Sequence, residues 1–338
     1  MIPRSLFVAA LLAALPASLC ASSSARAASP PTAAAPSSTT ATVAGGARRF
    51  HIDQAYEVKA LPPGAKEAQL FIPIPADDSF QKITGLAVSA DGATSVEVHD
   101  PAHGNGALRF TVPARGLSVH IGFDVERSEN AADLSRATGK PAPNGYAEWL
   151  RDDALVGVDD RIRKIVADVT KGAKTPLEKA RAIYAYTLST MKYQKTGEGW
   201  GKGSIVWACD MKYGNCTDFH ALLIGLLRAS GIPGRFQIGY SVPDTRSGEL
   251  PGYHCWAFFY LDGAGWIPVD ASEGWKNPDK RDYYFGHHDR NRFALSTGRD
   301  LTFPGMKGTP LNYFVFPYLE VDGQPGTVTR KTTFAESP

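Results

Sequence analysis

The pattern of apolar positions divides the chain into two parts. Turn-forming residues such as Asp91-Gly92 separate the segments of the first part, and no helical pattern lies between them. Six short segments alternate between apolar and polar residues, at 51–59, 68–74, 83–89, 94–98, 108–112 and 117–125. Short strands at this spacing predict an antiparallel β-sandwich over residues 48–130.

Helical periodicity begins after residue 145. Residues 158–171 place their apolar side chains on one face, and a glycine follows as a stop signal. Residues 175–178 read Thr-Pro-Leu-Glu, a capping box with proline at the first helical position, and the helical pattern then continues to about residue 191. Both helices are expected to pack as scaffold in a second domain.

A third helix carries Cys216 in its first turn. Asn215 is a favourable N-cap, and Gly231 ends the helical run. Apolar residues recur at a spacing of three and four: Phe219, Leu222, Leu223, Leu226 and Leu227. Unpaired amides and the positive end of the helix dipole favour a thiolate, which lowers the pKa of such a cysteine below the free value of about 8.5. This stretch alone leaves a reactive thiol and a buried structural cysteine equally open.

Strand patterns follow the third helix. Three strands are expected, at 235–240, 253–261 and 266–270. The turn residues 262–265 make the last two a β-hairpin. An apolar run at 311–321 is expected to return to the sheet as a late strand, and the tail from Thr327 is expected to fray.

The hairpin offers partners for a cysteine nucleophile. If Tyr260 pairs with Trp266 across the turn, His254 and Asp270 lie on one face as diagonal neighbours about 7–8 Å apart. A slip of one residue would send Asp270 to the opposite face. A thiolate needs a base, and the base needs an orienting group, so we expect His254 and Asp270 to serve Cys216 in these roles. The alternative is an ordinary sheet histidine and a turn carboxylate.

Composition and charge narrow the classes of function. The chain has 338 residues, of which 43% are hydrophobic, enough for a sizeable core and about two domains. With 36 basic and 34 acidic residues, the formal charge is only +2. This balance gives no electrostatic footprint for nucleic acid or for an anionic membrane, and neither partner is expected.

The N-terminus has the features of an export signal. Arg4 precedes an apolar run at 6–15, and residues 25–27 read Ala-Arg-Ala, which suits a signal peptidase. Residues 1–27 are therefore expected to be a cleaved signal peptide that directs the protein to the periplasm or the medium. The run of about ten residues is too short to span a bilayer, and no later stretch is long enough. Lipid anchoring at Cys20 is the alternative, disfavoured by the residues before it.

The expected organisation has four parts. The signal peptide is followed by a disordered linker at 28–47, rich in Ala, Ser, Thr and Pro, then by the β-sandwich at 48–130 and a catalytic domain at 145–325.

Loss of Cys20 with the signal peptide leaves three cysteines. These are Cys209, Cys216 and Cys255, so at least one thiol has no internal disulfide partner. If Cys216 is free, Cys209 and Cys255 could pair. No CxxC spacing and no regular acidic calcium loop is present, so no metal and no cofactor is expected.

Four motifs, taken together, carry a resemblance to a known family. They lie at 213–218, 228–235, 252–257 and 265–270. In this order they resemble the core of the transglutaminase-like superfamily, in its exported bacterial members. The resemblance covers about residues 150–300. It implies a papain-like α+β fold in which Cys216 is the nucleophile, His254 the base and Asp270 the orienter, often preceded by a β-sandwich.

The resemblance also points to groups around the nucleophile. Family members usually take oxyanion donors from the cysteine's own backbone amide and from a residue upstream. Tyr193 is the candidate here, with Trp200 and Trp207 behind it as further donors or as the wall of an acyl pocket. Asp218 and His220 are expected to cap or hydrogen-bond locally rather than to act in catalysis.

These residues permit thiolate attack on a carboxamide carbonyl, giving an acyl-thioester that a second nucleophile resolves. Water as the second nucleophile makes a peptidase or amidase, which is the expectation for an exported protein acting on a protein or peptide substrate. A lysine amine would make a protein crosslinker. A noncatalytic binding or assembly module is the alternative from another class. The oligomeric state does not follow from the sequence.

Overall fold

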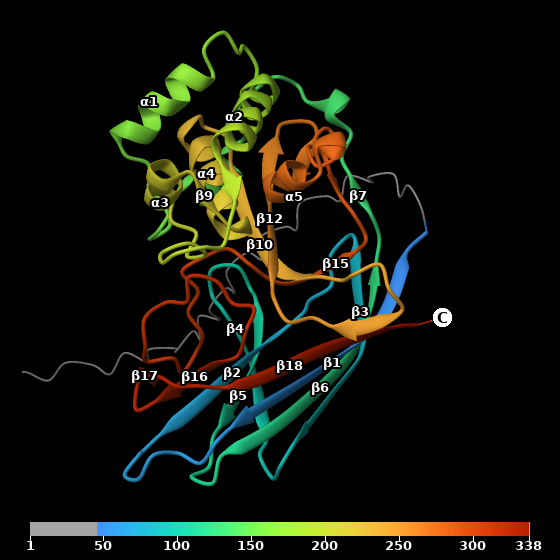
Figure 1. Ribbon diagram of the computed structural model, residues 1–338, viewed down its shortest axis with the longest axis vertical. Helices are drawn as coiled ribbons and strands as arrows, with labels where there is room; N and C mark the ends of the chain where they lie inside the picture. Colours follow the sequence, from blue (N-terminus) through green and yellow to red (C-terminus); the bar gives the residue numbers. More distant parts are fainter. Residues whose placement is uncertain (1–45, 338) are drawn as a thin grey trace, which may run out of the picture. The chain divides into compact units, whose positions relative to one another are not determined.

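The computed structural model describes residues 46–337 (Figure 1). The predicted signal peptide, Cys20 and all but the last two residues of the predicted linker lie outside the described residues. Within 46–337, no helix is both long and apolar enough to cross a membrane.

The first part of the chain forms antiparallel sheets, and all six strands predicted there are confirmed. They are β1 (Arg48–Val58), β2 (Ala68–Ile74), β3 (Gln81–Ala90), β4 (Ser95–His99), β5 (Gly106–Thr111) and β6 (Leu117–Arg127). Strict alternation in β1 buries every second side chain, so that Phe50 and Ile52 face a core shared with Leu70 and Ile72 of β2. One five-stranded sheet contains β1, β6 and β3, and the other contains β2, β5 and β4.

Strands from distant parts of the chain complete both sheets (Figure 1). They are β11 (Ser247–Glu249), β16 (Tyr318–Val321), β17 (Gln324–Pro325) and β18 (Thr329–Glu336). The late strand expected at 311–321 is thus present in its last four residues, where β16 pairs with β2. The described residues belong to one compact unit, and the boundaries 48–130 and 145–325 stay a prediction.

The prediction that the tail frays from Thr327 is wrong. β18 pairs with β1 on one side and with β11 on the other, and Phe334 lies opposite Ile52. Thr332 and Phe334 alternate with exposed residues and are buried at 3% exposure each, so two inward side chains suffice to seat the strand. With only two inward apolar or small side chains, β18 cannot be recognised as a strand from the sequence until its partner strand is known.

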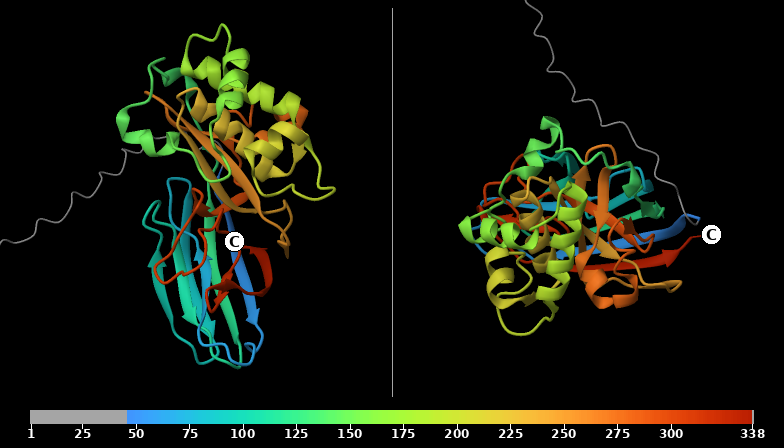
Figure 2. Two further views of the ribbon diagram at one scale, coloured as in Figure 1. Left: turned by 90° about the vertical axis from the view of Figure 1, so that its left-hand side faces the viewer. Right: turned by 90° about the horizontal axis from the view of Figure 1, so that it is seen from above.

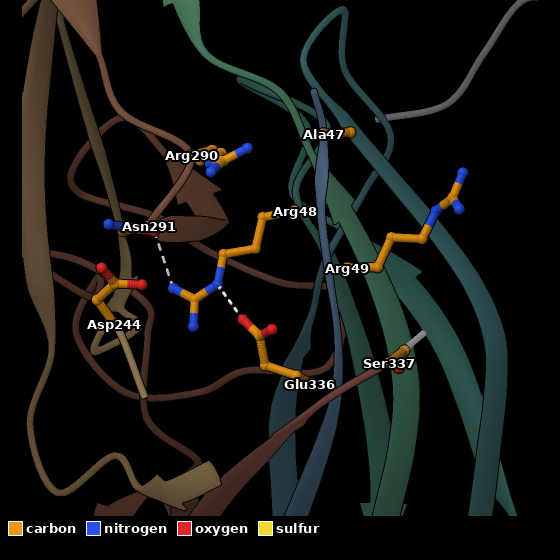
Figure 3. Close-up of a pocket in the computed structure, with 8 residues that line it drawn as sticks. All are labelled: Ala47, Arg48, Arg49, Asp244, Arg290, Asn291, Glu336 and Ser337. Carbon is orange, nitrogen blue, oxygen red and sulfur yellow. Dashed lines mark hydrogen bonds and ion pairs between the residues drawn. The ribbon is translucent and has the colours of Figure 1, made fainter. Parts of the chain in front are cut away.

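Arg48 ties the start of β1 to segments far away in the sequence (Figure 3). Its guanidinium donates to the Glu336 carboxylate at 2.7 Å, to Asn291 Oδ1 at 2.9 Å and to the Val242 carbonyl at 3.0 Å. The side chain is almost fully buried, and these acceptors satisfy its charge. The pocket around Arg48 is therefore a place where distant segments of the chain are held together, with its charged group already paired.

The second part is built on a four-stranded antiparallel sheet in the order β13-β12-β10-β15. The strands are β10 (Gly234–Ser241), β12 (His254–Leu261), β13 (Gly265–Val269) and β15 (Arg292–Thr297). Tyr260 pairs with Trp266 across the hairpin turn, so the predicted register is confirmed. Shorter elements are β7 (Asn130–Ala131), β8 (Lys192–Tyr193), β9 (Tyr213–Gly214), β14 (His287–His288), η1 (Leu134–Arg136), η2 (Asn144–Leu150) and η3 (Pro278–Lys280).

Helices gather around α4 (Figure 2), where α5 is orange and the other helices run from yellow-green to yellow. They are α1 (Asp160–Val169), α2 (Pro176–Thr190), α3 (Ile205–Met211), α4 (Cys216–Ala229) and α5 (Ala271–Lys276). α4 packs on β10 and β12 and contacts the other four helices, so all of its residues except Ala229 are buried. The three predicted helices are confirmed. α3 and α5 were not predicted, because six or seven residues are too few to show periodicity.

Candidate active site

Cys216 is the first residue of α4, and the local sequence explains why the helix begins there. The Asn215 side chain accepts a hydrogen bond from the Thr217 amide at 3.0 Å, and the Asp218 carboxylate accepts one from the Asn215 amide at 3.0 Å. This reciprocal capping box satisfies two amides at the helix start. It holds the Cys216 thiol, 2% exposed, at the positive end of the helix.

Asp218 does more than the local capping predicted for it. Its buried carboxylate also accepts from the Gly201 amide at 2.7 Å and the Gly203 amide at 3.0 Å. A Cβ at Gly214 would lie 2.1 Å from Asp218 Oδ2, so only glycine fits beneath the carboxylate. Asp218 therefore fastens the glycine-rich loop to the start of α4.

His254 and Asp270 lie side by side as the hairpin register predicted. His254 begins β12, while Asp270 directly follows β13 and is the N-cap of α5. His254 Nε2 and Asp270 Oδ2 are 2.7 Å apart. This leaves the other ring nitrogen, Nδ1, for a different partner, and Cys216 is the next neighbour that raises the pKa of His254. The structure thus brings the three predicted residues together.

The Asp270 carboxylate is fully buried, and every nearby group favours its ionised form. Oδ1 accepts hydrogen bonds from Ser272 Oγ and the Glu273 amide, each at 3.0 Å, and Oδ2 also accepts one from Arg292 Nη1 at 3.0 Å. Burial alone would raise the pKa of Asp270, but His254 and Arg292 hold it well below its usual range.

Arg292 is a residue that the sequence analysis missed. Its guanidinium, 2% exposed, is held by Asp289 Oδ2 at 2.6 Å as well as by Asp270, and lies 5.0 Å from the centre of the Trp256 ring. Arg292 stands on β15, two strands away from the hairpin, so no local spacing marks it as part of the site.

The electrostatics of the site favour a thiolate next to an imidazolium. Burial, the largest effect, would raise the pKa of Cys216, but hydrogen bonds from Cys255 and His254 and the positive charge of His254 bring it well below its ordinary value. Burial would lower the pKa of His254, but the charge and hydrogen bond of Asp270, together with Cys216, raise it to about 10. Both shifts favour a thiolate at Cys216 and an imidazolium at His254.

The oxyanion candidates occupy different places. Tyr193 pairs with Gly214 in the parallel ladder of β8 and β9, and burial followed by the charge of Cys216 raises the pKa of its hydroxyl to about 12. The indole N–H of Trp200 donates to the Gly197 carbonyl at 3.0 Å. That of Trp207 donates to the Tyr213 carbonyl at 3.0 Å. Both indoles thus already have acceptors, whereas Tyr193 lies beside Gly214, two residues before the nucleophile.

The third cysteine of the described chain also belongs to the site. Cys209, Cys216 and Cys255 are all free thiols in this part of the chain, so the possible pairing of Cys209 with Cys255 is not formed. Cys255 instead lies against Cys216 and His220, both on α4. His220 is not confined to the local role predicted for it, since its ring contacts both β12 and the start of α5.

The comparison with protein families agrees with this geometry. Residues 163–271 match the family described as the transglutaminase-like superfamily.

Among curated proteins, an uncharacterised protein of Haemophilus influenzae is 23% identical over 323 residues, which cover 82% of this chain and 87% of that protein. The uncharacterised protein YebA of Bacillus subtilis is 23% identical over 137 residues, covering 35% of this chain and 18% of YebA.

A solved structure shares the fold over most of the chain. It is described as a "putative cysteine protease" from Cytophaga hutchinsonii, is 14% identical and superimposes with a TM-score of 0.62 over 87% of this chain and 99% of that one. The α+β fold with a transglutaminase-like core is therefore confirmed.

Proposed function

We propose that the protein is a cysteine-dependent acyl-transfer enzyme that cleaves carboxamide or peptide bonds, with Cys216 as nucleophile, His254 as acid and base, and Asp270 as orienter. One observation carries the proposal. The 2.7 Å bond between His254 Nε2 and Asp270 Oδ2 fixes the ring so that Nδ1 serves the Cys216 sulfur at a helix N-terminus.

The first half of the reaction forms the acyl-enzyme. The Cys216 thiolate attacks the carbonyl carbon, a C–S bond forms, and the carbonyl electron pair moves onto oxygen. His254 then gives the Nδ1 proton to the leaving nitrogen, the C–N bond breaks, and an amine or ammonia departs. Asp270 stabilises the imidazolium until that proton is transferred.

The negative oxygen needs donors while it exists. The Cys216 amide is one of the first four of α4, which have no partner within the helix, and the Asn215 side chain takes the next one at Thr217. The Cys216 amide is therefore the first oxyanion donor in this proposal. Tyr193 is the second, since it pairs with Gly214, two residues before the nucleophile, and the charge of Cys216 acts on its hydroxyl.

The second half of the reaction decides the class of enzyme. Neutral His254 takes a proton from water, the resulting hydroxide attacks the thioester, and the Cys216 thiolate leaves with release of a carboxylic acid. Hydrolysis suits the predicted export, which would place the enzyme among protein or peptide substrates of the periplasm or the medium. It also agrees with the description of the Cytophaga protein as a "putative cysteine protease". With a lysine amine as acceptor, the same thioester would give a crosslink.

Two experiments test the proposal. The first tests Cys216 as the nucleophile: iodoacetamide at neutral pH should label Cys216 far faster than a free cysteine, and Cys216→Ala should abolish turnover of amide substrates. The enzyme proposal fails, and a binding or assembly module remains, if labelling is ordinary and the variant matches the wild type.

The second experiment identifies the acceptor. A glutamine-containing peptide is incubated with the protein and a labelled primary amine. Ammonia or a cleaved peptide without the label supports hydrolysis, while incorporation of the amine supports transfer.

A further inference from the structure

A second sulfur lies near that of Cys216. Cys255 follows His254 on β12, is fully buried, and lies close enough for the two thiols to shift each other's pKa. Behind it, His220 Nδ1 lies 3.4 Å from Cys255 Sγ. The proposed reaction uses neither Cys255 nor His220, although both are buried and polarisable groups next to the nucleophile.

Main-chain groups fix the tautomer of His220. The Ala271 amide donates to His220 Nε2 at 3.2 Å, and an amide can only donate, so Nε2 carries no proton. Asp270 Oδ1 is farther away, at 3.6 Å, and already accepts two hydrogen bonds. The proton of the neutral ring is therefore on Nδ1, which faces Cys255 Sγ. Burial lowers the pKa of His220, in agreement with a neutral ring.

The tautomer of His220 also determines which way the hydrogen bond to Cys255 runs. Because His220 Nδ1–H donates to Cys255 Sγ, the S–H of Cys255 is left for another acceptor, and the neighbouring Cys216 sulfur is the candidate. A thiolate at Cys216 can only accept. We propose that Cys255 is a positioning residue whose S–H donates to the Cys216 thiolate, at the end of a donor chain that runs from the Ala271 amide through His220.

The donor chain would act before substrate binds, so it rests on the proposed function of Cys216 as a nucleophile. It stabilises the thiolate and fixes the direction of the sulfur lone pairs. Burial raises the pKa of Cys255 well above its ordinary value, so Cys255 keeps its proton while Cys216 loses one. An S–H is a weak donor, and its removal should change the thiolate-to-thiol ratio of Cys216 about tenfold, or about one pH unit.

The test compares two replacements of Cys255 in the full chain. Cys255→Ser keeps a donor of similar size, and Cys255→Ala removes it. The rate of iodoacetamide alkylation is measured against pH from the mass of the peptide that contains Cys216. Cys255→Ala should raise the midpoint by about one pH unit, and Cys255→Ser should hold it at or below the wild-type value. Cys209→Ala, a buried cysteine on α3, is the matched control and should leave the midpoint unchanged.

Two outcomes overturn the proposal: an unchanged midpoint in Cys255→Ala, or an equal rise in both Cys255 variants, which would indicate repacking. Ordinary labelling of wild-type Cys216 would instead contradict the proposed function. If Cys255→Ala does not fold, nitrogen NMR of the unmodified protein decides. It should show His220 as the neutral Nδ1–H tautomer. An Nε2–H tautomer or an imidazolium would contradict the proposed donor chain from the Ala271 amide to Cys255.

Discussion

The substitution Asp270→Asn removes one negative charge and keeps the size of the side chain. In the wild type, Asp270 Oδ2 accepts from His254 at 2.7 Å inside a fully buried site, so the bond is charge-assisted and unscreened by solvent. Such bonds contribute about 1.5–3 kcal/mol. Losing one should therefore shift the balance from the thiolate–imidazolium pair toward the neutral pair by about 10- to 150-fold.

The direction of the pH effect follows from the pKa of His254. Burial lowers this pKa, but the charges and hydrogen bonds of Asp270 and Cys216 raise it to about 10. Without the carboxylate, His254 is a weaker base and loses its proton at a lower pH. The imidazolium then supports the thiolate less, so the alkylation midpoint of Cys216 should rise by about one to two pH units. Alkylation by iodoacetamide measures this without knowledge of the substrate.

Asp289→Asn is the matched control for this substitution. Asp289 contacts the same Arg292, at 2.6 Å, as Asp270 does, and removing its charge leaves the bond between His254 and Asp270 in place. Its alkylation midpoint should stay within about 0.3 pH units of the wild type. Equal shifts in both variants would refute the reasoning, because they would trace the effect to the net charge around Arg292. An unshifted midpoint in Asp270→Asn would refute it as well.

Three other substitutions test separate parts of the account. Asp218→Ala removes a capping box and two bonds to the glycine-rich loop, and urea unfolding should show a loss of about 3 kcal/mol; a loss below about 1 kcal/mol would mean that the loop is held by other contacts. Phe334→Ala should cost about 3 kcal/mol in the same assay, whereas a frayed β18 would lose almost nothing. Tyr193→Phe should lower kcat by at least about 100-fold at constant melting temperature, and an unchanged kcat would exclude its hydroxyl as an oxyanion donor.

The sequence predicted the parts of the site that short-range patterns encode. The cap at Asn215 and the apolar spacing behind it placed Cys216 at a helix start, and the hairpin turn set the register that joins His254 to Asp270. Both features depend on residues close together in the chain. Packing of distant segments therefore changes neither the start of the helix nor the register of the hairpin.

The parts that were missed arise from contacts between distant segments. Arg292 reaches Asp270 from a strand two places away in the sheet, and His220 meets Cys255 only because α4 packs on β12. On a helix, His220 looked like one of several local polar residues. Only the packed fold shows that its two ring nitrogens face groups from different elements.

In the proposed reaction, Cys216 forms a thioester with the acyl group of a substrate. This step is tested by mixing the protein with a peptide p-nitrophenyl ester, quenching with acid within a second and locating the added mass by peptide mapping. We expect one acyl group per protein on Cys216, a burst of p-nitrophenol equal to the protein concentration, and neither in Cys216→Ala. An acyl group on another residue, or a burst that survives in Cys216→Ala, would contradict the proposed reaction.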